Sequence, residues 1–266
     1  MRLLTQGGIL LGAVMLVAFV PVREDVHEES CCDTAEAALA TYVEHAVPPP
    51  AAANGKVRGK VLFGGKERPV AKPEKIDGKS SEGCTSGKVD STNRSLLISA
   101  SGGVKNAVIT IAVPNAKVKV PKKPIGLDQI ACRFEPHVLL IPAGATAEFL
   151  NSDKISHNVH LVVRKNRPFN RTVAAGKSEK TVLKRAEAIR VGCDLHPWME
   201  CYLFVTDTPY TVATDSEGRF ELPDVPPGEY EIKVWHEKLG KTKSKVTIAA
   251  DGSSTPVEIV MAPKSR

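Results

Sequence analysis

A short segment in the second half of the chain carries a cysteine, a histidine and a methionine at close spacing. It runs from Cys193 to Met199 in the pattern C-x-x-H-x-x-M, and a further histidine, His157, lies upstream. Two imidazoles, one thiolate and one thioether are the ligands of mononuclear electron-transfer copper sites, in which the Met sulfur is a weak axial ligand. The residue types therefore predict one bound copper ion, with the ligands His157, Cys193, His196 and Met199.

Two separate backbone stretches must bring these side chains together. His157 lies where the polar turn 151–156 runs into an apolar strand. The segment 188–191 enters the Cys-to-Met loop and 202–205 leaves it, and both are short and rich in β-branched or aromatic residues, as strands are. Because the loop is tight, its three ligand side chains can converge on one point.

Other readings of these residues are open. Zinc could be held by a tetrahedral set of His157, His160, Cys193 and His196. However, His157 and His160 are three positions apart, so on a strand they would point to opposite faces. Met199 is also a poor ligand for zinc and a good one for copper. A binuclear copper site would need a second cysteine inside the loop, and Cys201 follows Met199. Without a metal, Cys193 would be a core thiol, His196 a loop residue and Met199 core filler.

The region 134–205 resembles the cupredoxins, the blue copper proteins that include plastocyanin and amicyanin. The segment 136–151 is similar to the family's strand, Gly turn and strand ending in Asn, and His157-Asn158 is similar to its first-ligand dipeptide. The Cys-to-Met loop resembles the short ligand loop of amicyanin. The resemblance implies the same four copper ligands, with Met199 on the axis, and it implies that the Asn158 side chain ties the two ligand loops together.

The resemblance also implies a function, which is single-electron transfer without catalysis. We expect the electron to leave through His196, whose ring edge would reach the surface beside Pro197 and Trp198 in a small apolar docking patch. The alternative is an exported copper-binding or copper-storage module, or a cell-surface structural module, with no redox role. A copper oxidase or nitrite reductase would need further histidine clusters, and the chain has seven histidines and no His-x-His pattern.

A second resemblance lies at the C-terminal end. The segment 215–236 alternates apolar and polar positions on either side of a Pro-Pro-Gly turn, and it resembles the carboxypeptidase-regulatory, transthyretin-like β-sandwich. The strand 57–61 resembles the first strand of that module. Two arrangements stay open: either the copper domain is inserted into this sandwich, or the segment 96–113 supplies the first strands of the cupredoxin.

Composition supports an all-β fold, and the two resemblances imply that it consists of a cupredoxin Greek-key sandwich plus a small prealbumin-like β-sandwich. Aromatic residues make up 5% of the 266 residues, Gly and Pro number 20 and 19, and turn signals recur about every ten residues. The formal charge of +6 is spread along the chain. This charge suits an acidic redox partner and is too mild and dispersed for nucleic acid.

The N-terminus predicts export. Residues 1–22 have a basic start and an apolar core of signal-peptide length, and an uncleaved membrane anchor stays open because no clear cleavage site follows. We therefore expect a periplasmic or extracellular protein, membrane-tethered if the leader stays. The expected organisation is a leader at 1–22, a linker at 23–54, an N-terminal β region at 55–125, the cupredoxin domain at 126–207 and the second sandwich at 208–266.

Export favours disulfides, because the compartments outside the cytosol are oxidising. Of the six cysteines, Cys193 is assigned to copper and Cys84 is expected to pair with Cys132. Cys31 and Cys32 lie in the linker, and Cys201 could be a buried free thiol. The other polar residues receive simpler interpretations: His160 on a strand surface, His137 structural, His236 without a partner, and Asp194 and Glu200 solvated.

Overall fold

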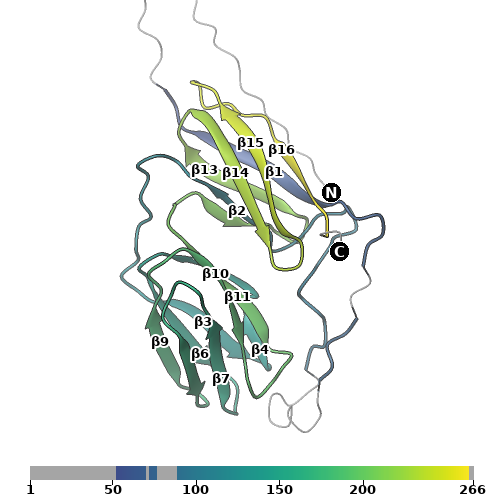
Figure 1. The fold of residues 1–266 in the computed structure, drawn as a ribbon, viewed down its shortest axis with the longest axis vertical. Coiled ribbons are helices and arrows are strands. Elements are labelled where there is room, and N and C mark those ends of the chain that lie inside the picture. The colour runs from purple at the N-terminus through teal and green to yellow at the C-terminus, as the bar shows by residue number, and fades with distance from the viewer. Residues whose placement is uncertain (1–51, 70–71, 77–88, 264–266) are drawn as a thin grey trace, which may run out of the picture. The chain divides into compact units, whose positions relative to one another are not determined.

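The computed structural model describes residues 52–69, 72–76 and 89–263, and this part of the chain is all-β, which confirms the predicted fold class. Its strands form four sheets, coloured along the chain in Figure 1. No helix within the described ranges is long and apolar enough to cross a membrane. The predicted leader and most of the predicted linker lie outside these ranges.

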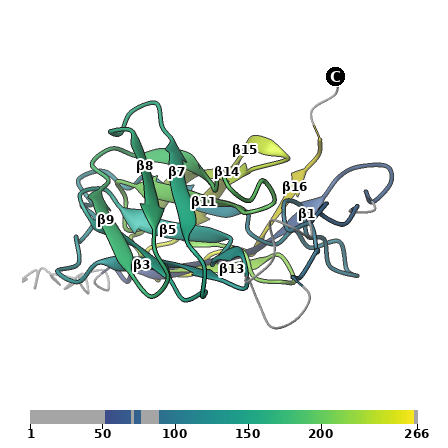
Figure 2. The same ribbon diagram turned by 90° about the horizontal axis from the view of Figure 1, so that it is seen from below.

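The middle of the chain forms a first sandwich of two sheets. One sheet has the strand order β5-β11-β10-β7-β8 and the other has β4-β3-β6-β9. Figure 2 shows β7 and β8 side by side, as their antiparallel pairing requires. The strands are β3 (Ile125–Ile130), β4 (Arg133–Glu135), β5 (Val138–Pro142), β6 (Thr146–Asn151), β7 (His157–Val162), β8 (Phe169–Val173), β9 (Ser178–Val182), β10 (Glu187–Gly192) and β11 (Glu200–Thr206).

Alternation along the strands explains why this sandwich closes. Along β11, Cys201, Leu203 and Val205 are buried while Tyr202 and Phe204 are only half-buried, because successive side chains point to opposite faces. The inward-facing side chains of both sheets form one core, which includes the fully buried ring of Phe149. The metal-site residues of the Cys-to-Met loop extend this core at one end.

The remaining strands form a second sandwich around a core of its own. Its sheets have the orders β13-β1-β16 and β12-β2-β14-β15. The strands are β1 (Gly55–Phe63), β2 (Val108–Ile111), β12 (Thr211–Ala213), β13 (Arg219–Val225), β14 (Gly228–His236), β15 (Gly240–Ile248) and β16 (Val257–Met261).

The pairing of β1 and β2 separates the two arrangements left open by the sequence. β1 pairs with β13 and β16, and β2 pairs with β12 and β14, so both N-terminal strands belong to the second sandwich. Figure 1 shows β1 among the late strands. The strands of the first sandwich lie between β2 and β12 in the chain, and the copper-site segment is therefore inserted into the second sandwich.

Close backbone approach holds β1 in place. A Cβ atom added at Gly59 would lie 2.2 Å from the carbonyl oxygen of Val257 on β16 and 2.6 Å from the ring of Phe220 on β13. Only glycine fits between these two neighbours, so the parallel pairing of β1 with the last strand depends on a residue without a side chain.

His236, expected to have no partner, is buried at the end of β14 and has several. Its Nδ1 accepts hydrogen bonds from the backbone N–H groups of Lys238 and Leu239, in the turn that leads to β15. Burial, with smaller contributions from the nearby His137 and Lys238, lowers the pKa of His236 to about 4, although a hydrogen bond to the backbone of Lys105 opposes the shift. The imidazole is therefore neutral in the folded chain at neutral pH.

This burial predicts acid sensitivity. As pH falls from 6.5 toward 4, the unfolded chain binds a proton at residue 236 that the folded chain does not. The free energy of unfolding should therefore fall by up to about 3 kcal/mol over this range. Urea titrations of His236→Gln at a series of pH values should show a shallower fall, whereas the exposed-site control His160→Gln should match the parent. An unchanged pH slope in His236→Gln would contradict the assignment.

Candidate metal centre

His157 is the first residue of β7, and its imidazole is completely buried. Its Nε2 lies 2.7 Å from Oδ2 of Asp153, four residues earlier in the turn that precedes the strand. Because a carboxylate accepts hydrogen bonds, this contact places the ring proton on Nε2. The lone pair of Nδ1 is then free to bind a metal ion, which is the tautomer that a histidine ligand requires.

Asp153 is itself held by the backbone. Its two carboxylate oxygens accept hydrogen bonds from the N–H groups of Ala131 and Cys132, at 2.7 and 2.8 Å, in the turn between β3 and β4. Its own N–H donates to the side chain of Asn151. The carboxylate is buried and anchored before it meets His157. Such outer partners fix the orientation of a histidine ligand and raise its basicity.

The Cys-to-Met loop is a tight turn closed by its own backbone. The ladder between β10 and β11 runs to the pair Gly192 and Glu200, so the loop begins at once beyond the sheet. The N–H of Cys193 donates to the carbonyl of Met199, and the N–H of Met199 donates to the carbonyl of His196. All three side chains are at least 95% buried, with exposures of 5%, 1% and 4% for Cys193, Met199 and His196.

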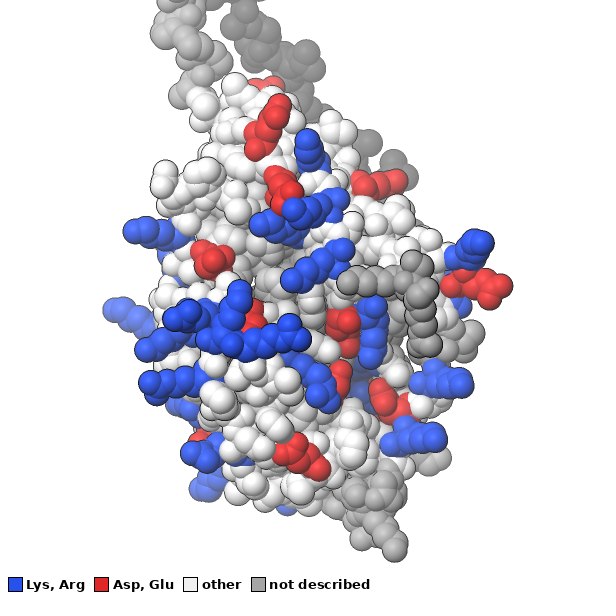
Figure 3. Space-filling model, in the orientation of Figure 1, with Lys and Arg blue, Asp and Glu red and all other residues white. Residues whose placement is uncertain are grey.

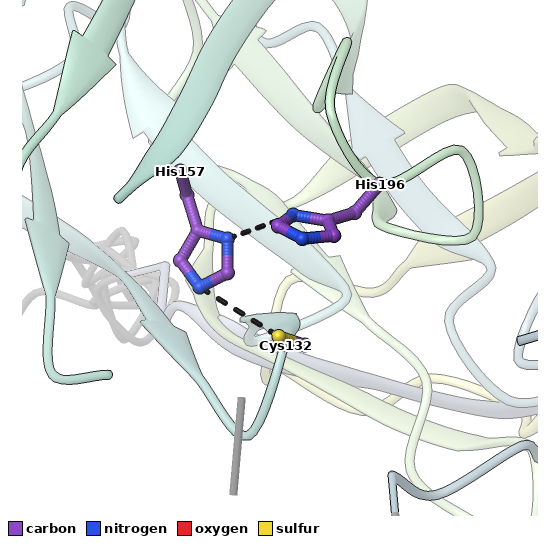
Figure 4. A group of neighbouring side chains, drawn as sticks. All are labelled: Cys132, His157 and His196. Atoms are coloured by element: carbon purple, nitrogen blue, oxygen red, sulfur yellow. Dashed lines mark hydrogen bonds between the residues drawn. The ribbon is translucent and has the colours of Figure 1, made fainter. Parts of the chain in front are cut away.

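The donor atoms of the two stretches meet. Nδ1 of His157 lies 3.0 Å from Nδ1 of His196, and that second nitrogen lies 3.5 Å from Sγ of Cys193. The two imidazoles are 4.8 Å apart between ring centroids and inclined by 68°. Figure 4 shows both nitrogens turned toward each other, one ring from the start of β7 and the other from the Cys-to-Met loop. The buried Nδ1 of His196 thus contacts both Nδ1 of His157 and the thiol sulfur of Cys193.

Asn158 connects the start of β7 to the Cys-to-Met loop through two hydrogen bonds. Its backbone N–H lies 3.3 Å from the sulfur of Cys193 and donates to it. Its side-chain Oδ1 accepts a hydrogen bond from the N–H of Asp194, at 3.1 Å. The residue after the first histidine therefore holds the residue after the cysteine, the arrangement that the cupredoxin resemblance implies for Asn158.

The electrostatics of Cys193 keep it a protonated thiol until a metal binds. Burial raises the pKa of this thiol, and the negative charge of Asp194 raises it further, although N–H groups of Asn158, Leu195 and His196 donate to the sulfur and lower it. The thiol therefore keeps its proton in the metal-free chain at neutral pH. Metal binding would release that proton, and affinity would rise with pH.

The donor set fits copper. Two imidazole nitrogens and a cysteine sulfur are brought together, and Met199 is buried in the same loop. Another sulfur, Sγ of Cys132, lies 3.9 Å from Nε2 of His157 (Figure 4). Although Cys132 and the two histidines form a compact group, Cys132 is in a disulfide and has no thiolate to offer. Its expected partner Cys84 lies outside the described residues, so that pairing stays a prediction.

The zinc set does not form. The side chain of His160 is 44% exposed and pairs with Asp194 instead of facing the centre. His157 and His160 point to opposite faces of β7, as strand alternation requires. Asp194 was expected to be simply solvated and instead binds both His160 and Asn170, which lowers the pKa of its carboxyl. Glu200 likewise pairs with Arg190.

The expected surface patch needs correction at two residues. His196 is 4% exposed, so its ring edge does not reach the surface as the sequence led us to expect. Trp198 is buried as well. This indole is 5% exposed, its Nε1 donates to the carbonyl of Cys132, and its ring lies 5.2 Å from that of His196. The carbonyl of Cys132, in the β3–β4 turn, accepts from the indole N–H and so keeps the Trp198 side chain inside the protein. The buried indole packs against the ring of His196. The exposed apolar residues of the loop are Leu195, at 53%, and Pro197.

His137 and Cys201 have the structural roles that the sequence led us to expect. His137, before β5, is bonded through Nε2 to Glu237 of the second sandwich and takes no part in the centre. Cys201 is a buried free thiol whose pKa burial raises well above its usual value. Both residues serve packing rather than ligation.

Comparison with known protein families supports the second resemblance. Residues 202–262 match the model of the carboxypeptidase regulatory-like domain family, which confirms the likeness seen in segment 215–236. A search of curated protein sequences finds no match.

Solved structures similar to this chain include three copper proteins or cupredoxins. They are a copper-containing nitrite reductase (NirK) from Thermus scotoductus SA-01 (24% identity, TM-score 0.31), a purple cupredoxin from Nitrosopumilus maritimus (22%, 0.27) and a reduced amicyanin variant (22%, 0.30). The matches cover 37%, 30% and 37% of this chain. They span 25% of the nitrite reductase chain and 98% of each of the other two. With TM-scores this low, the matches carry no argument for the ligands, and the ligand assignment depends on the geometry above.

Proposed function

We propose that this chain is an exported blue copper protein that carries single electrons and is not itself an enzyme. One observation carries the proposal: the buried Nδ1 of His196 lies 3.0 Å from Nδ1 of His157 and 3.5 Å from Sγ of Cys193, so that donor atoms from two separate stretches of chain are in contact. Met199, buried in the same loop, would be the fourth residue to hold the ion. Copper would supply a one-electron couple between Cu(II) and Cu(I) when bound.

The protein's part is to hold these donors still. Asp153 fixes the His157 ring through Nε2, and the β3–β4 turn fixes Asp153. Asn158 holds the thiol loop through Asp194. Because the donors sit in a packed β-sandwich, little has to move when an electron arrives, and a small rearrangement is what fast electron transfer requires. The N–H of Asn158 on the Cys193 sulfur and the burial of the site would tune the potential.

His196 is the proposed exit for the electron. It is the ligand between the exposed residues Leu195 and Pro197, which offer a small apolar contact surface in the ligand loop itself. Weak redox encounters use small interfaces of this kind. The formal charge of +6 favours an acidic partner, whose encounter rate would fall as salt is added.

His196→Ala should weaken copper binding and slow electron transfer, because it removes both a ligand and the proposed exit. Stopped-flow oxidation of the reduced, copper-loaded protein by ferricyanide measures the rate, and competition with a copper chelator measures affinity. The matched control is His160→Ala, which removes an exposed histidine that pairs with Asp194 outside the centre. Equal rates in both variants, or the absence of a reversible couple in voltammetry of the parent protein, would contradict electron transfer and favour copper storage.

A further inference from the structure

A cleft of about 700 Å³ lies on the side of the first sandwich opposite its core, and both sandwiches line it. One wall is the outer face of β10 and β11, and the other is formed by β2, β14 and β15. The volume is in the range of pockets that hold small organic ligands. The cleft contains none of the proposed copper ligands, so it calls for a separate explanation.

Aromatic rings form the apolar part of the cleft. Trp235 on β14 lies 5.2 Å from the ring of Tyr202 and 5.6 Å from the ring of Phe204, both on β11. All three side chains are half-buried and line the cleft. Outward-facing strand positions ordinarily carry polar groups, so three adjoining rings here provide faces on which a ring-shaped ligand can pack.

Buried polar atoms without partners lie in the same walls. The side chain of Glu237 is 2% exposed, and only one of its oxygens is engaged, by Nε2 of His137. The other oxygen, Oε2, and the hydroxyl of Thr110 are buried without any hydrogen-bond partner among the described residues, and both residues line the cleft. Because a buried polar atom without a partner is costly, these two atoms indicate a missing hydrogen-bonding group.

Positive charge surrounds the opening. Arg164, Lys165 and Lys241 line the cleft, and none of them forms an ion pair with a carboxylate in the described part of the chain. Figure 3 shows Lys and Arg side chains gathered at mid-height on the face it presents, with few acidic side chains among them. Exposed cations without partners attract an anionic ligand.

We propose that this cleft binds an acidic saccharide, a chain of sugar rings that carry carboxylates. The apolar face of a sugar ring can pack on Trp235 and Tyr202, and its carboxylates can pair with the cations that have no carboxylate partner. An acidic peptide is the rival occupant that the test has to exclude. β2, β10, β11 and β14 are each paired on both sides and offer no backbone edge, whereas β15 pairs only with β14 and has one free edge.

Isothermal titration of the full-length chain with tetragalacturonate at low salt tests the proposal. We expect saturable binding that weakens as salt rises, because charge pairs contribute. Lys241→Glu and Trp235→Ala should each weaken binding by about tenfold or more, as central contacts do. The matched control is Lys245→Glu, which makes the same charge change on β15 at a residue that does not line the cleft, and it should bind within about twofold of the parent.

The results that would overturn the proposal are distinct. Equal losses in Lys241→Glu and Lys245→Glu would show general charge attraction instead of a site. Equally tight binding of neutral cellotetraose, or of tetraglutamate, would remove the acidic-sugar assignment, and absence of binding would remove the site. If circular dichroism shows that Trp235→Ala does not fold, the surface variant Lys241→Glu still tests whether the cleft binds the saccharide. Copper spectra of all variants should match the parent, so this test is independent of the proposed electron transfer.

Discussion

Copper-loaded Cys193→Ser protein is expected to lose the intense red-region absorption of the parent. That absorption arises from the bond between copper and a cysteine thiolate, and Cys193 supplies the only free thiol that the described structure brings to the two histidines. A serine hydroxyl is a hard ligand and a weak one for copper, so affinity should fall as well. Absorption spectra during copper titration measure both effects.

The matched control for this experiment is Cys201→Ser. Cys201 is the other buried free thiol among the described residues, and its place on β11 separates it from the ligand loop. It should keep the absorption at parental intensity, with a modest loss of stability for burying a hydroxyl. If Cys201→Ser loses the band and Cys193→Ser keeps it, the ligand assignment is wrong.

Asp153→Asn is expected to lower copper affinity by about 10- to 100-fold, the range found when an outer-shell partner of a metal ligand is removed. The carboxylate accepts from Nε2 of His157 and from two backbone N–H groups, whereas an amide would turn a donor toward at least one of them. The reduction potential should rise, because loss of a buried negative charge near the site favours Cu(I) over Cu(II). Chelator competition and voltammetry measure the two effects.

Asp194→Asn is the control that separates the two ways in which Asp153 could act, namely by orienting the His157 ring or only by its negative charge. Asp194 is an exposed carboxylate directly after the proposed thiolate ligand, and it contacts His160 and Asn170 instead of a ligand ring. This control should change affinity much less than Asp153→Asn does. Similar shifts in both variants would mean that Asp153 acts only through its charge and does not orient His157.

The proposed ligand residues could be located in the sequence because their signal is local. The Cys-to-Met loop places three of the four in a single turn between two strands, and that turn forms as the pattern C-x-x-H-x-x-M suggests. The first histidine could be found because a polar turn leading into an apolar strand marks a strand end. Because side chains alternate along a strand, the sequence also predicted that only one of His157 and His160 could face the ligand loop.

Asp153 was missed because its role depends on distant residues. An acid in a polar turn is ordinary, and only the N–H groups of Ala131 and Cys132, from another turn, hold it against His157. The same turn explains Trp198, whose N–H finds a carbonyl 66 residues away and is thereby kept inside. A tryptophan after an exposed proline looked like a surface residue because this acceptor cannot be read from the neighbouring sequence.

The insertion could not be settled for a similar reason. β1 pairs in parallel with β16 at the other end of the described chain, and such long-range register leaves no local trace. The apolar alternation of β2 suits either sandwich equally well. Only its pairing with β12 and β14 assigns it to the second one.

The most direct measurement is a copper titration of the full-length protein followed by absorption and electron spin resonance. Our account predicts saturation at one Cu(II) per chain, an intense red-region band and the narrow copper hyperfine splitting of a thiolate-bound type 1 site. A colourless Cu(II) complex with the wide splitting of an ordinary nitrogen and oxygen site, or no stoichiometric binding at all, would contradict it.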